Sequence, residues 1–363
     1  MTVSTIPVVQ TAAVLRGPYG VRHSIEHTWP VPSPRPGEAL VRIQAASLCA
    51  GDLHLREGWP PAPPDAIRPM VLGHEAIGVI VGLGYDTETS GFHVGDQVAM
   101  GWRRSVCNGC DSCRAGRDNL CPSQQSHGGS DLGLFQEYLT VPTATLVPVP
   151  PTRISAAHLA PLTCAGTTAL ASIRAIGAEK GRWVAITGAA GGVGSLALKY
   201  AKHLGFRTVA IDSEAKESFC KRSNPDVFIS FESQSLVETI LDATDGGVHG
   251  TVVCSPASVA YMCDSPAFLA YYSPTAIEYS APGATIVAVG TAEISFRTSK
   301  LMAKGLKLIG QKNGSRADMR DALAMANVGI VPEIEAITLD RIDSALDRLN
   351  YTEVLGRQVF VFS

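Results

Sequence analysis

The fold is decided by residues 183–204, which read WVAITGAAGGVGSLALKYAKHL. The apolar run 183–187 predicts a strand, residues 188–194 a glycine-rich turn, and residues 195–204 a helix. A glycine motif indicates dinucleotide binding only when it stands between a strand and a helix in this way. The segment therefore predicts the first βαβ unit of a nucleotide-binding domain.

An acidic residue follows the next predicted strand. The apolar run Thr208–Ile211 ends on Asp212, eighteen residues after Gly194. A carboxylate at this place can accept a hydrogen bond from the 2'-hydroxyl of the adenosine ribose, and it repels a 2'-phosphate. We therefore expect NAD rather than NADP as the cofactor.

Outward from this segment the chain shows two different patterns. Residues 1 to about 150 are rich in Pro and Gly and carry short Val and Ile runs between turn signals, which favours an irregular β-rich domain. After about residue 160, strand-length apolar runs alternate with helical segments, for example at 208–212, 250–254 and 285–290. This alternation predicts an α/β domain with a doubly wound parallel sheet and helices on both faces.

Length and charge exclude several classes of protein. The chain has 363 residues, 45% of them hydrophobic and 17% charged, which is enough for two domains with separate cores. Its formal net charge of -3 gives no basic surface for nucleic acid or anionic lipid. The first residues lack the apolar core of a secretory signal, and no apolar stretch approaches the roughly 20 residues of a membrane helix. We expect a cytoplasmic protein that acts on a small molecule.

Four of the nine cysteines lie close together. They are Cys107, Cys110, Cys113 and Cys121, with the spacing C-x2-C-x2-C-x7-C. Four thiolates satisfy tetrahedral zinc and leave no open position, so such a zinc would be structural. An iron–sulfur cluster also uses four thiolates, but nothing nearby suggests electron transfer. We therefore expect a structural zinc.

Three further residues could bind a second metal. A catalytic zinc needs three protein ligands and one open position, and the candidates are Cys49, His74 and Cys164. Each is weak evidence alone, because a single Cys is more often a small buried apolar residue. Their appearance together, around the four-cysteine loop, favours a metal site.

On these residues the chain resembles the yeast-type zinc alcohol dehydrogenases of the medium-chain dehydrogenase/reductase superfamily. The resemblance covers nearly the whole chain and is carried by the four-cysteine loop and residues 49–54, 73–75, 162–166, 188–195 and 355–357. It implies a GroES-like catalytic domain, formed by residues 1–164 and 315–363 and holding both zinc ions. Residues 165–314 would form a Rossmann NAD-binding domain.

The resemblance also implies roles for individual residues. Cys49, His74 and Cys164 would bind the catalytic zinc, with Asp52 orienting His74 and Glu75 serving as a transient ligand. The residues expected to bind the cofactor are Gly188, Gly191, Gly192, Gly194, Asp212, Lys216, Thr168 and Arg357, with Arg357 at the pyrophosphate. Those expected to line the substrate pocket are Gly51, Trp59 and Trp102.

The chain departs from the family pattern at three places. Gly51 replaces the usual Thr or Ser, and Ala50 replaces the His or Arg that is often found against the pyrophosphate. Residues 261–273 look like an insertion. In the family, the hydroxyl at position 51 passes the alcohol's proton through the cofactor ribose to a histidine, here His54. Glycine has no hydroxyl and leaves room. Either a bound water replaces the hydroxyl and the protein is an ordinary alcohol dehydrogenase, or its substrate is larger than ethanol and simple alcohols are oxidised slowly.

The expected function is zinc-dependent hydride transfer between NAD(H) and an alcohol or carbonyl substrate, with two zinc ions per chain. One alternative is an NADH-dependent reductase of a conjugated C=C or C=N bond in a larger, secondary-metabolite-like substrate. Another is a non-catalytic protein that binds NAD and zinc. The resemblance further implies a homodimer or homotetramer, with no nucleic-acid or membrane partner.

Overall fold

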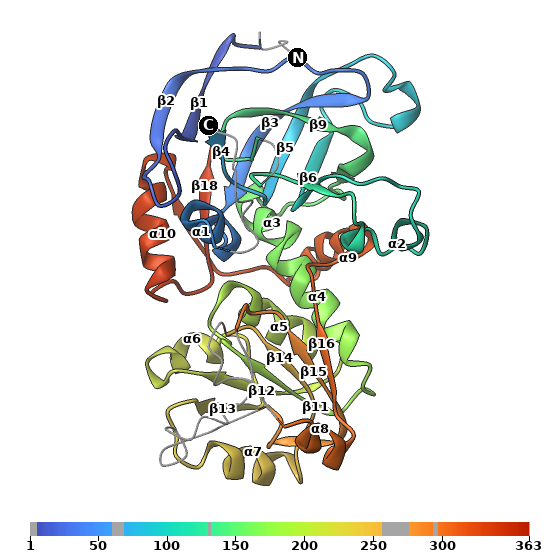
Figure 1. Cartoon of the computed structure of the whole chain (residues 1–363), viewed down its shortest axis with the longest axis vertical. Helices are drawn as coiled ribbons and strands as arrows, with labels where there is room; N and C mark the ends of the chain where they lie inside the picture. Colours follow the sequence, from blue (N-terminus) through green and yellow to red (C-terminus); the bar gives the residue numbers. More distant parts are fainter. Residues whose placement is uncertain (1–5, 60–68, 130–131, 256–275, 293–296, 363) are drawn as a thin grey trace. The chain divides into compact units, whose positions relative to one another are not determined.

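The computed structural model describes residues 6–59, 69–129, 132–255, 276–292 and 297–362 (Figure 1). The expected insertion at 261–273 therefore lies outside the described residues. The chain divides into two compact units. The first comprises Met1–Thr167 and Ser315–Ser363, and the second comprises Thr168–Gly314. The resemblance implies domain boundaries after residues 164 and 314, so the first boundary differs by three residues.

The first unit is built on a seven-stranded sheet with the order β10-β6-β5-β3-β18-β17, in which β9 also pairs with β3. A three-stranded sheet β2-β1-β4 and the ribbon β7-β8 complete its strands. The strands are β1 Val9–Leu15, β2 Ser24–Pro30, β3 Glu38–Ser47, β4 Met70–Val71, β5 Ala76–Leu83, β6 Gln97–Met100, β7 Arg103–Ser105, β8 Gln125–Ser126, β9 Tyr138–Pro142, β10 Val147–Pro148, β17 Ile334–Ile337 and β18 Arg357–Val361.

Short helices connect these strands. They are α1 Ala50–Glu57, α2 Asp111–Arg114, α3 Ala156–Leu159, α9 Arg316–Ala326 and α10 Ile342–Asn350, with 3-10 turns η1 Glu88–Ser90, η2 Asp118–Leu120, η3 Thr143–Thr145, η4 Ala160–Thr163 and η7 Leu339–Arg341. Alternate residues of the strands bury aliphatic and aromatic side chains in one core. In that core the rings of Phe135 and Phe360 meet edge to face at 5.0 Å between centroids.

Three neighbouring strands of this sheet have an end on the same side, where the strands begin or end. β3 ends at Ser47, the antiparallel β5 begins at Ala76, and β18 begins at Arg357. The backbone ladder joins these ends, since Ser47 N donates to the Glu75 carbonyl at 2.8 Å. The residues just beyond the strand ends are therefore brought together, although they lie far apart in the sequence.

The second unit contains a six-stranded sheet with the order β13-β12-β11-β14-β15-β16, in which every neighbouring pair is parallel. Counted within the unit, this is the strand order 3-2-1-4-5-6 of the Rossmann fold. The strands are β11 Trp183–Thr187, β12 Arg207–Asp212, β13 Val227–Ser230, β14 Val248–Val253, β15 Ser280–Ala288 and β16 Lys307–Gly310. The predicted doubly wound parallel sheet is confirmed.

Helices of the second unit alternate with its strands, as the sequence predicts. They are α4 Ala165–Ile176, α5 Gly192–His203, α6 Glu217–Lys221, α7 Leu236–Thr244 and α8 Thr298–Lys304, with the 3-10 turn η5 Glu214–Lys216. The glycine-rich turn joins β11 to α5. It needs glycine because a Cβ on Gly194 would lie 2.1 Å from the Gly188 carbonyl oxygen, and because Gly188 has a φ of +64°.

Candidate active site

The structure brings the three predicted ligands of the catalytic metal together at the edge of the first unit's sheet. One ligand atom from each of Cys49, His74, Glu75 and Cys164 lies within 4.8 Å of the others. Cys49 follows β3, His74 and Glu75 precede β5, and Cys164 follows η4. All are buried except Cys49, which is partly buried. Two cysteines and one histidine are a donor set that catalytic zinc uses.

Asp52 organises two of these ligands at once. Its side chain is fully buried, and its Oδ2 accepts a hydrogen bond from the backbone N of Cys49 at 2.9 Å. Its Oδ1 accepts from the backbone N of Gly73 at 3.1 Å and from Nδ1 of His74 at 2.9 Å. Because an ionised carboxylate only accepts, the Nδ1 of His74 is the protonated nitrogen, and Nε2 keeps its lone pair for a metal.

The same carboxylate also starts the helix. Cys49 is the N-cap of α1, and Asp52 occupies the N3 position of a capping box. The helix therefore begins directly after Cys49, two residues beyond the end of β3, and its first turn is hydrogen-bonded to the backbone of this ligand. This is the arrangement that the resemblance implied for Asp52, with the added contact to Cys49.

Glu75 lies beside the three ligands, and one of its two carboxylate oxygens is hydrogen-bonded to Arg357. Its Oε2 accepts a hydrogen bond from Nη2 of Arg357. Its Oε1 lies 3.8 Å from Nε2 of His74 and, among the described residues, has no hydrogen-bond partner although it is buried. A buried carboxylate oxygen without a donor is costly unless a cation completes it. The four donor atoms therefore fit a metal ion.

Arg357 and Ser47 complete this side of the site. Arg357 has an exposed fraction of 6%, and its Nε and Nη2 donate to Oγ of Ser47 at 3.1 and 2.8 Å. The sequence reasoning missed both the role of Ser47 and the Glu75–Arg357 pair, whose members are 282 residues apart. No local pattern signals such a pair. The expected contact of Arg357 with the pyrophosphate stays a prediction.

The electrostatics of the cluster suit a cation. The hydrogen bond with Cys164 and the neighbouring His74 hold the pKa of the Cys49 thiol well below its ordinary value, against the effect of burial. Burial raises the pKa of the Glu75 carboxyl to about 8, although Arg357 opposes this. A divalent cation among these donors would stabilise both thiolates, because a coordinating metal deprotonates a thiol.

The predicted pocket residues Gly51 and Trp102 lie beside the ring of His74, whereas Trp59 lies beside His54 of α1. The Trp102 and His74 rings meet edge to face at 4.7 Å between centroids, and an added Cβ on Gly51 would lie 3.0 Å from Cε1 of His74. We expected Gly51 to leave space for a larger substrate. In the direction of its missing side chain, the rings of His74 and Trp102 already lie close by. Trp59 packs instead against His54 at 5.5 Å, and 45% of its surface is exposed.

The four predicted structural ligands also meet. The thiol sulfurs of Cys107, Cys110, Cys113 and Cys121 lie within 4.8 Å of one another. Sγ of Cys107 lies 3.5 Å from that of Cys121 and 4.0 Å from that of Cys113. Hydrogen bonds from the backbone of Gly109 and Cys110 lower the pKa of the Cys107 thiol to about 6. This geometry suits a closed tetrahedral site.

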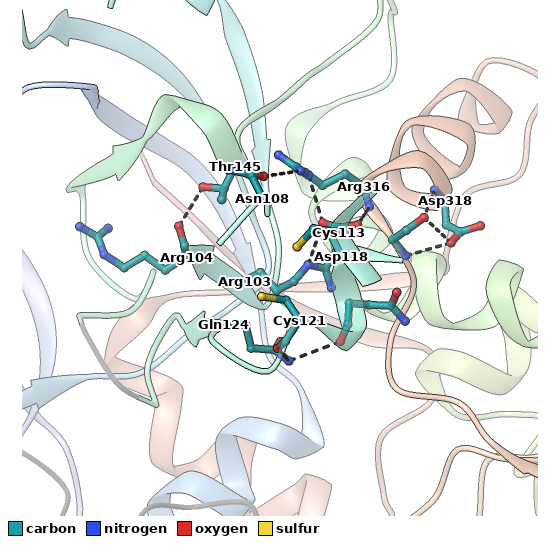
Figure 2. Close-up of polar contacts among 12 residues, drawn as sticks. Arg103, Arg104, Asn108, Cys113, Asp118, Cys121, Gln124, Thr145, Arg316 and Asp318 are labelled. Atoms are coloured by element: carbon teal, nitrogen blue, oxygen red, sulfur yellow. Dashed lines mark hydrogen bonds and ion pairs between the residues drawn. The ribbon is translucent and has the colours of Figure 1, made fainter. Parts of the chain in front are cut away.

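A polar network anchors the four-cysteine loop to its surroundings (Figure 2). Asp118, between the third and fourth cysteines, lies 3.3 Å from Nε of Arg103 and 3.0 Å from Nε of Arg316. It also accepts from the backbone N of Arg316, the first residue of α9, at 3.1 Å. Nη2 of Arg316 donates to Oδ1 of Asn108 at 3.2 Å. The loop is thus tied to β7 and to α9.

In the second unit, Asp212 lies at the glycine-rich turn. Its Oδ2 accepts from the backbone N of Ala190 at 2.8 Å, and its Oδ1 accepts from that of Ser213 at 2.9 Å. The Nζ of Lys216 is 3.8 Å from Oδ1. The structure therefore gathers the carboxylate, the lysine and the turn that contains Gly188, Gly191, Gly192 and Gly194. Thr168 is buried in the first turn of α4.

Among the described residues, no single helix has the length and apolar composition to cross a membrane. The helical segments Ala156–Thr163 and Ala165–Ile176 meet at a bend. Only when the two are taken together are they long and apolar enough.

Comparison with known proteins identifies the family. The model of the alcohol dehydrogenase GroES-like domain matches residues 35–151, and that of the zinc-binding dehydrogenases matches residues 192–327. Alcohol dehydrogenase 2 of Caenorhabditis elegans is 33% identical to the chain, with 100% of this chain and 99% of that protein aligned.

Solved structures agree with this result. A structure of an NAD-dependent alcohol dehydrogenase has a TM-score of 0.84 and 26% identity, covering 97% of this chain and 100% of that one. The alcohol dehydrogenase of the archaeon Aeropyrum pernix has a TM-score of 0.83 and 27% identity, with the same coverage. The chain therefore belongs to the zinc-type alcohol dehydrogenases of the medium-chain dehydrogenase/reductase superfamily, and it is an oxidoreductase.

Proposed function

We propose that the protein transfers a hydride between NAD(H) and an alcohol or carbonyl substrate with the help of zinc. The observation that carries the proposal is the buried cluster of Cys49, His74 and Cys164, with Asp52 bonded to both Cys49 and His74. These ligands would fill three positions of a tetrahedral zinc and leave one for the substrate. When bound, zinc would supply a Lewis acid that polarises the substrate's C–O bond.

The residues of the chain prepare this site in different ways. The thiolates of Cys49 and Cys164 offset the charge of a dication, while Asp52 keeps the proton of His74 on Nδ1. Glu75 offers a further oxygen at 3.8 Å from His74, and Arg357 holds its other oxygen. That ion pair opposes a large movement of the carboxylate, so any contact of Glu75 with the metal would use the free Oε1.

The second unit would bind the cofactor. The amide-rich turn at the start of α5 suits a pyrophosphate, because helix N-termini attract anions. Asp212 beside this turn favours an unphosphorylated ribose, which supports NAD over NADP. A structural relative is described as NAD-dependent. We further propose that Lys216 and Thr168 contact the cofactor, as the resemblance implied.

We also propose a second, structural zinc in the four-cysteine loop, which gives two zinc ions per chain. The four sulfurs leave no position open for a substrate. The substrate would be a small molecule, and the assembly a homodimer or homotetramer. The expected alternative of a non-catalytic protein is disfavoured, because the chain belongs to a family of enzymes and keeps the ligands of an open metal site.

Gly51 favours a second candidate for the reaction itself. Without a hydroxyl at this position, the side chain of residue 51 cannot accept the proton of an alcohol, and positioned proton transfer is worth about 10²- to 10⁴-fold in rate. Reduction of a conjugated C=C bond adds the hydride to one carbon and a proton to another, and reduction of a C=N bond adds the proton to nitrogen, so in neither reaction does a proton move between the substrate oxygen and a hydroxyl at position 51. An enal or imine in a larger molecule is therefore the alternative substrate class.

The metal content provides the first test. We expect elemental analysis of the purified protein to find close to two zinc ions per chain. Cys110→Ser should remove one zinc and lower the melting temperature, because it opens the closed site. His74→Ala should remove the other zinc and abolish turnover while the protein remains folded. A Cys110→Ser protein with full zinc and unchanged stability would disprove the structural site.

Cofactor choice tests the role of Asp212. We expect kcat/KM to be higher with NADH than with NADPH, because the carboxylate repels a 2'-phosphate. Asp212→Asn should lower this preference by removing the charge. Glu238→Gln is a matched control that removes an exposed charge of the same unit, on α7, and it should leave the ratio unchanged. Equal values for the two cofactors in the wild type would contradict the assignment.

A substrate screen separates the two reactions. NADH consumption should be measured with simple aldehydes, ketones, enals and imines, and alcohol oxidation with NAD at neutral pH. We expect large carbonyl substrates to be reduced well and ethanol to be oxidised slowly. Faster turnover of enals or imines, with C=C or C=N as the reduced bond, would establish the alternative. No NADH consumption with any of these classes would contradict both.

A further inference from the structure

We propose that Asp118 of the four-cysteine loop is a positioning residue for Cys164, the third ligand of the open metal site. It acts through Arg103 and Arg316, so that a metal in the loop supports a metal at the open site. The inference deepens the proposed function and rests on it, because that function assigns Cys164 to a catalytic metal and the four cysteines of the loop to a structural one.

Cys164 differs from the other two ligands in what holds it. Asp52 is hydrogen-bonded to the backbone N of Cys49 and to the ring of His74. Cys164 instead stands between η4 and α4, three residues before the first unit ends at Thr167. The place of its sulfur therefore depends on the elements against which η4 packs.

The turn η4 packs against the end of β6 and against α9. Gly101, the residue after β6, lies where these elements meet. A Cβ there would lie 2.5 Å from Cε of Met319 of α9 and 2.8 Å from the carbonyl oxygen of Thr163, the residue before Cys164. Because Met319 is buried in this close packing, a shift of α9 would move the backbone that leads into Cys164.

Asp118 holds the first residue of α9 in two ways (Figure 2). Its Oδ1 accepts from the backbone N of Arg316 at 3.1 Å, and its Oδ2 lies 3.0 Å from Nε of the same residue. Nη2 of Arg316 also donates to Asn108, next to the first cysteine of the loop. Arg316 lies directly after the point where the chain re-enters the first unit, between Gly314 and Ser315. The loop therefore fixes the start of the helix that packs on η4.

Arg103 forms a second link, which is electrostatic. Its side chain is buried, and its Nε lies 3.3 Å from Oδ2 of Asp118. Burial lowers the pKa of this guanidinium, whereas the negative charges of Asp118 and of a Cys164 thiolate raise it. The same buried cation thus interacts with the loop and with the open site. Without Asp118 its charge would be uncompensated and would oppose a dication at Cys164.

These two links predict that the loop and the open site are coupled. A metal in the loop fixes the backbone at Asp118, since the amide of Cys121, the fourth ligand, donates to the Asp118 carbonyl at 3.1 Å. The carboxylate then holds α9 and offsets the charge of Arg103, and both effects favour a metal at Cys164. A simpler explanation is that Asp118 only stabilises the loop. In that case its loss would lower the melting temperature but leave the metal affinity of the open site unchanged.

Cobalt binding to the full-length protein distinguishes these explanations without relying on turnover. Co²⁺ is titrated into protein that keeps its loop zinc but is freed of zinc at the open site. The thiolate-to-cobalt absorption that is absent in His74→Ala is assigned to the open site. Asp118→Asn should keep its loop zinc, because all four sulfurs are intact. We expect its Kd for Co²⁺ to rise about 10-fold, as is typical when the support of a metal ligand is removed. The absorption band should also shift, because the sulfur of Cys164 moves.

Asp111→Asn is the control from the same loop. Asp111 lies between the second and third cysteines, but its side chain is 96% exposed and pairs with Arg114. The substitution removes the same charge from the loop without breaking a contact to Arg103 or Arg316. We expect this variant to bind Co²⁺ with the affinity and spectrum of the wild type.

A double variant tests the route through α9. Arg316→Gln alone should raise the Kd for Co²⁺ about 3-fold, because it loosens the start of the helix. Its side chain is 28% exposed, so this variant also decides the question if Asp118→Asn does not fold or loses its loop zinc. In the Asp118→Asn background, Arg316→Gln should raise the Kd by less than it does in the wild type, which is the non-additivity expected of residues in contact.

Three results would overturn the proposal. They are an unchanged Kd and absorption band in Asp118→Asn with the loop zinc in place, an equal rise of the Kd in Asp111→Asn, and purely additive effects in the double variant. If the wild type itself shows no cobalt site that depends on His74, the proposed function fails and this inference with it. If that site is present but is unaffected by the loss of Asp118, only this inference fails.

Discussion

The site depends on one buried carboxylate. Asp52 accepts three hydrogen bonds, from the backbone of Cys49, the backbone of Gly73 and the ring of His74. The first two fix where the chain runs after β3 and before β5, and the third fixes which nitrogen of the imidazole is free. Because this carboxylate is fully buried, its negative charge needs all three donors. Asp52 thereby holds Cys49 and His74 in place beside the strand ends before a metal binds.

The other ionisable groups near Asp52 need positive partners in order to be buried. Glu75 and the two thiols would be expensive to ionise in this interior without positive partners. Arg357 supplies one such partner and is itself held by Ser47, while a dication among the sulfurs would supply the other. The four-cysteine loop is tied to β7 through Asp118 and Arg103, one residue from Trp102. The two predicted metal sites thus belong to one connected unit.

The sequence predicts the parts of this protein whose signals are local. The strand, glycine turn and helix at residues 183–204 predict the parallel sheet. The cysteines and the histidine, at the spacing found in the family, predict both metal sites. The Glu75–Arg357 pair could not be predicted, because its members are 282 residues apart and meet only across strand ends. The space beside Gly51 could not be predicted either. A missing side chain suggests room, but tertiary packing of Trp102 and His74 decides whether the room exists.

The central claim is that a zinc ion binds among Cys49, His74 and Cys164. The most direct measurement is anomalous diffraction at the zinc absorption edge from crystals of the full-length protein. The account predicts two peaks per chain, one among these three side chains and one among the four cysteines of the loop. A peak at the loop alone, in protein that reduces carbonyl substrates with NADH, would contradict it.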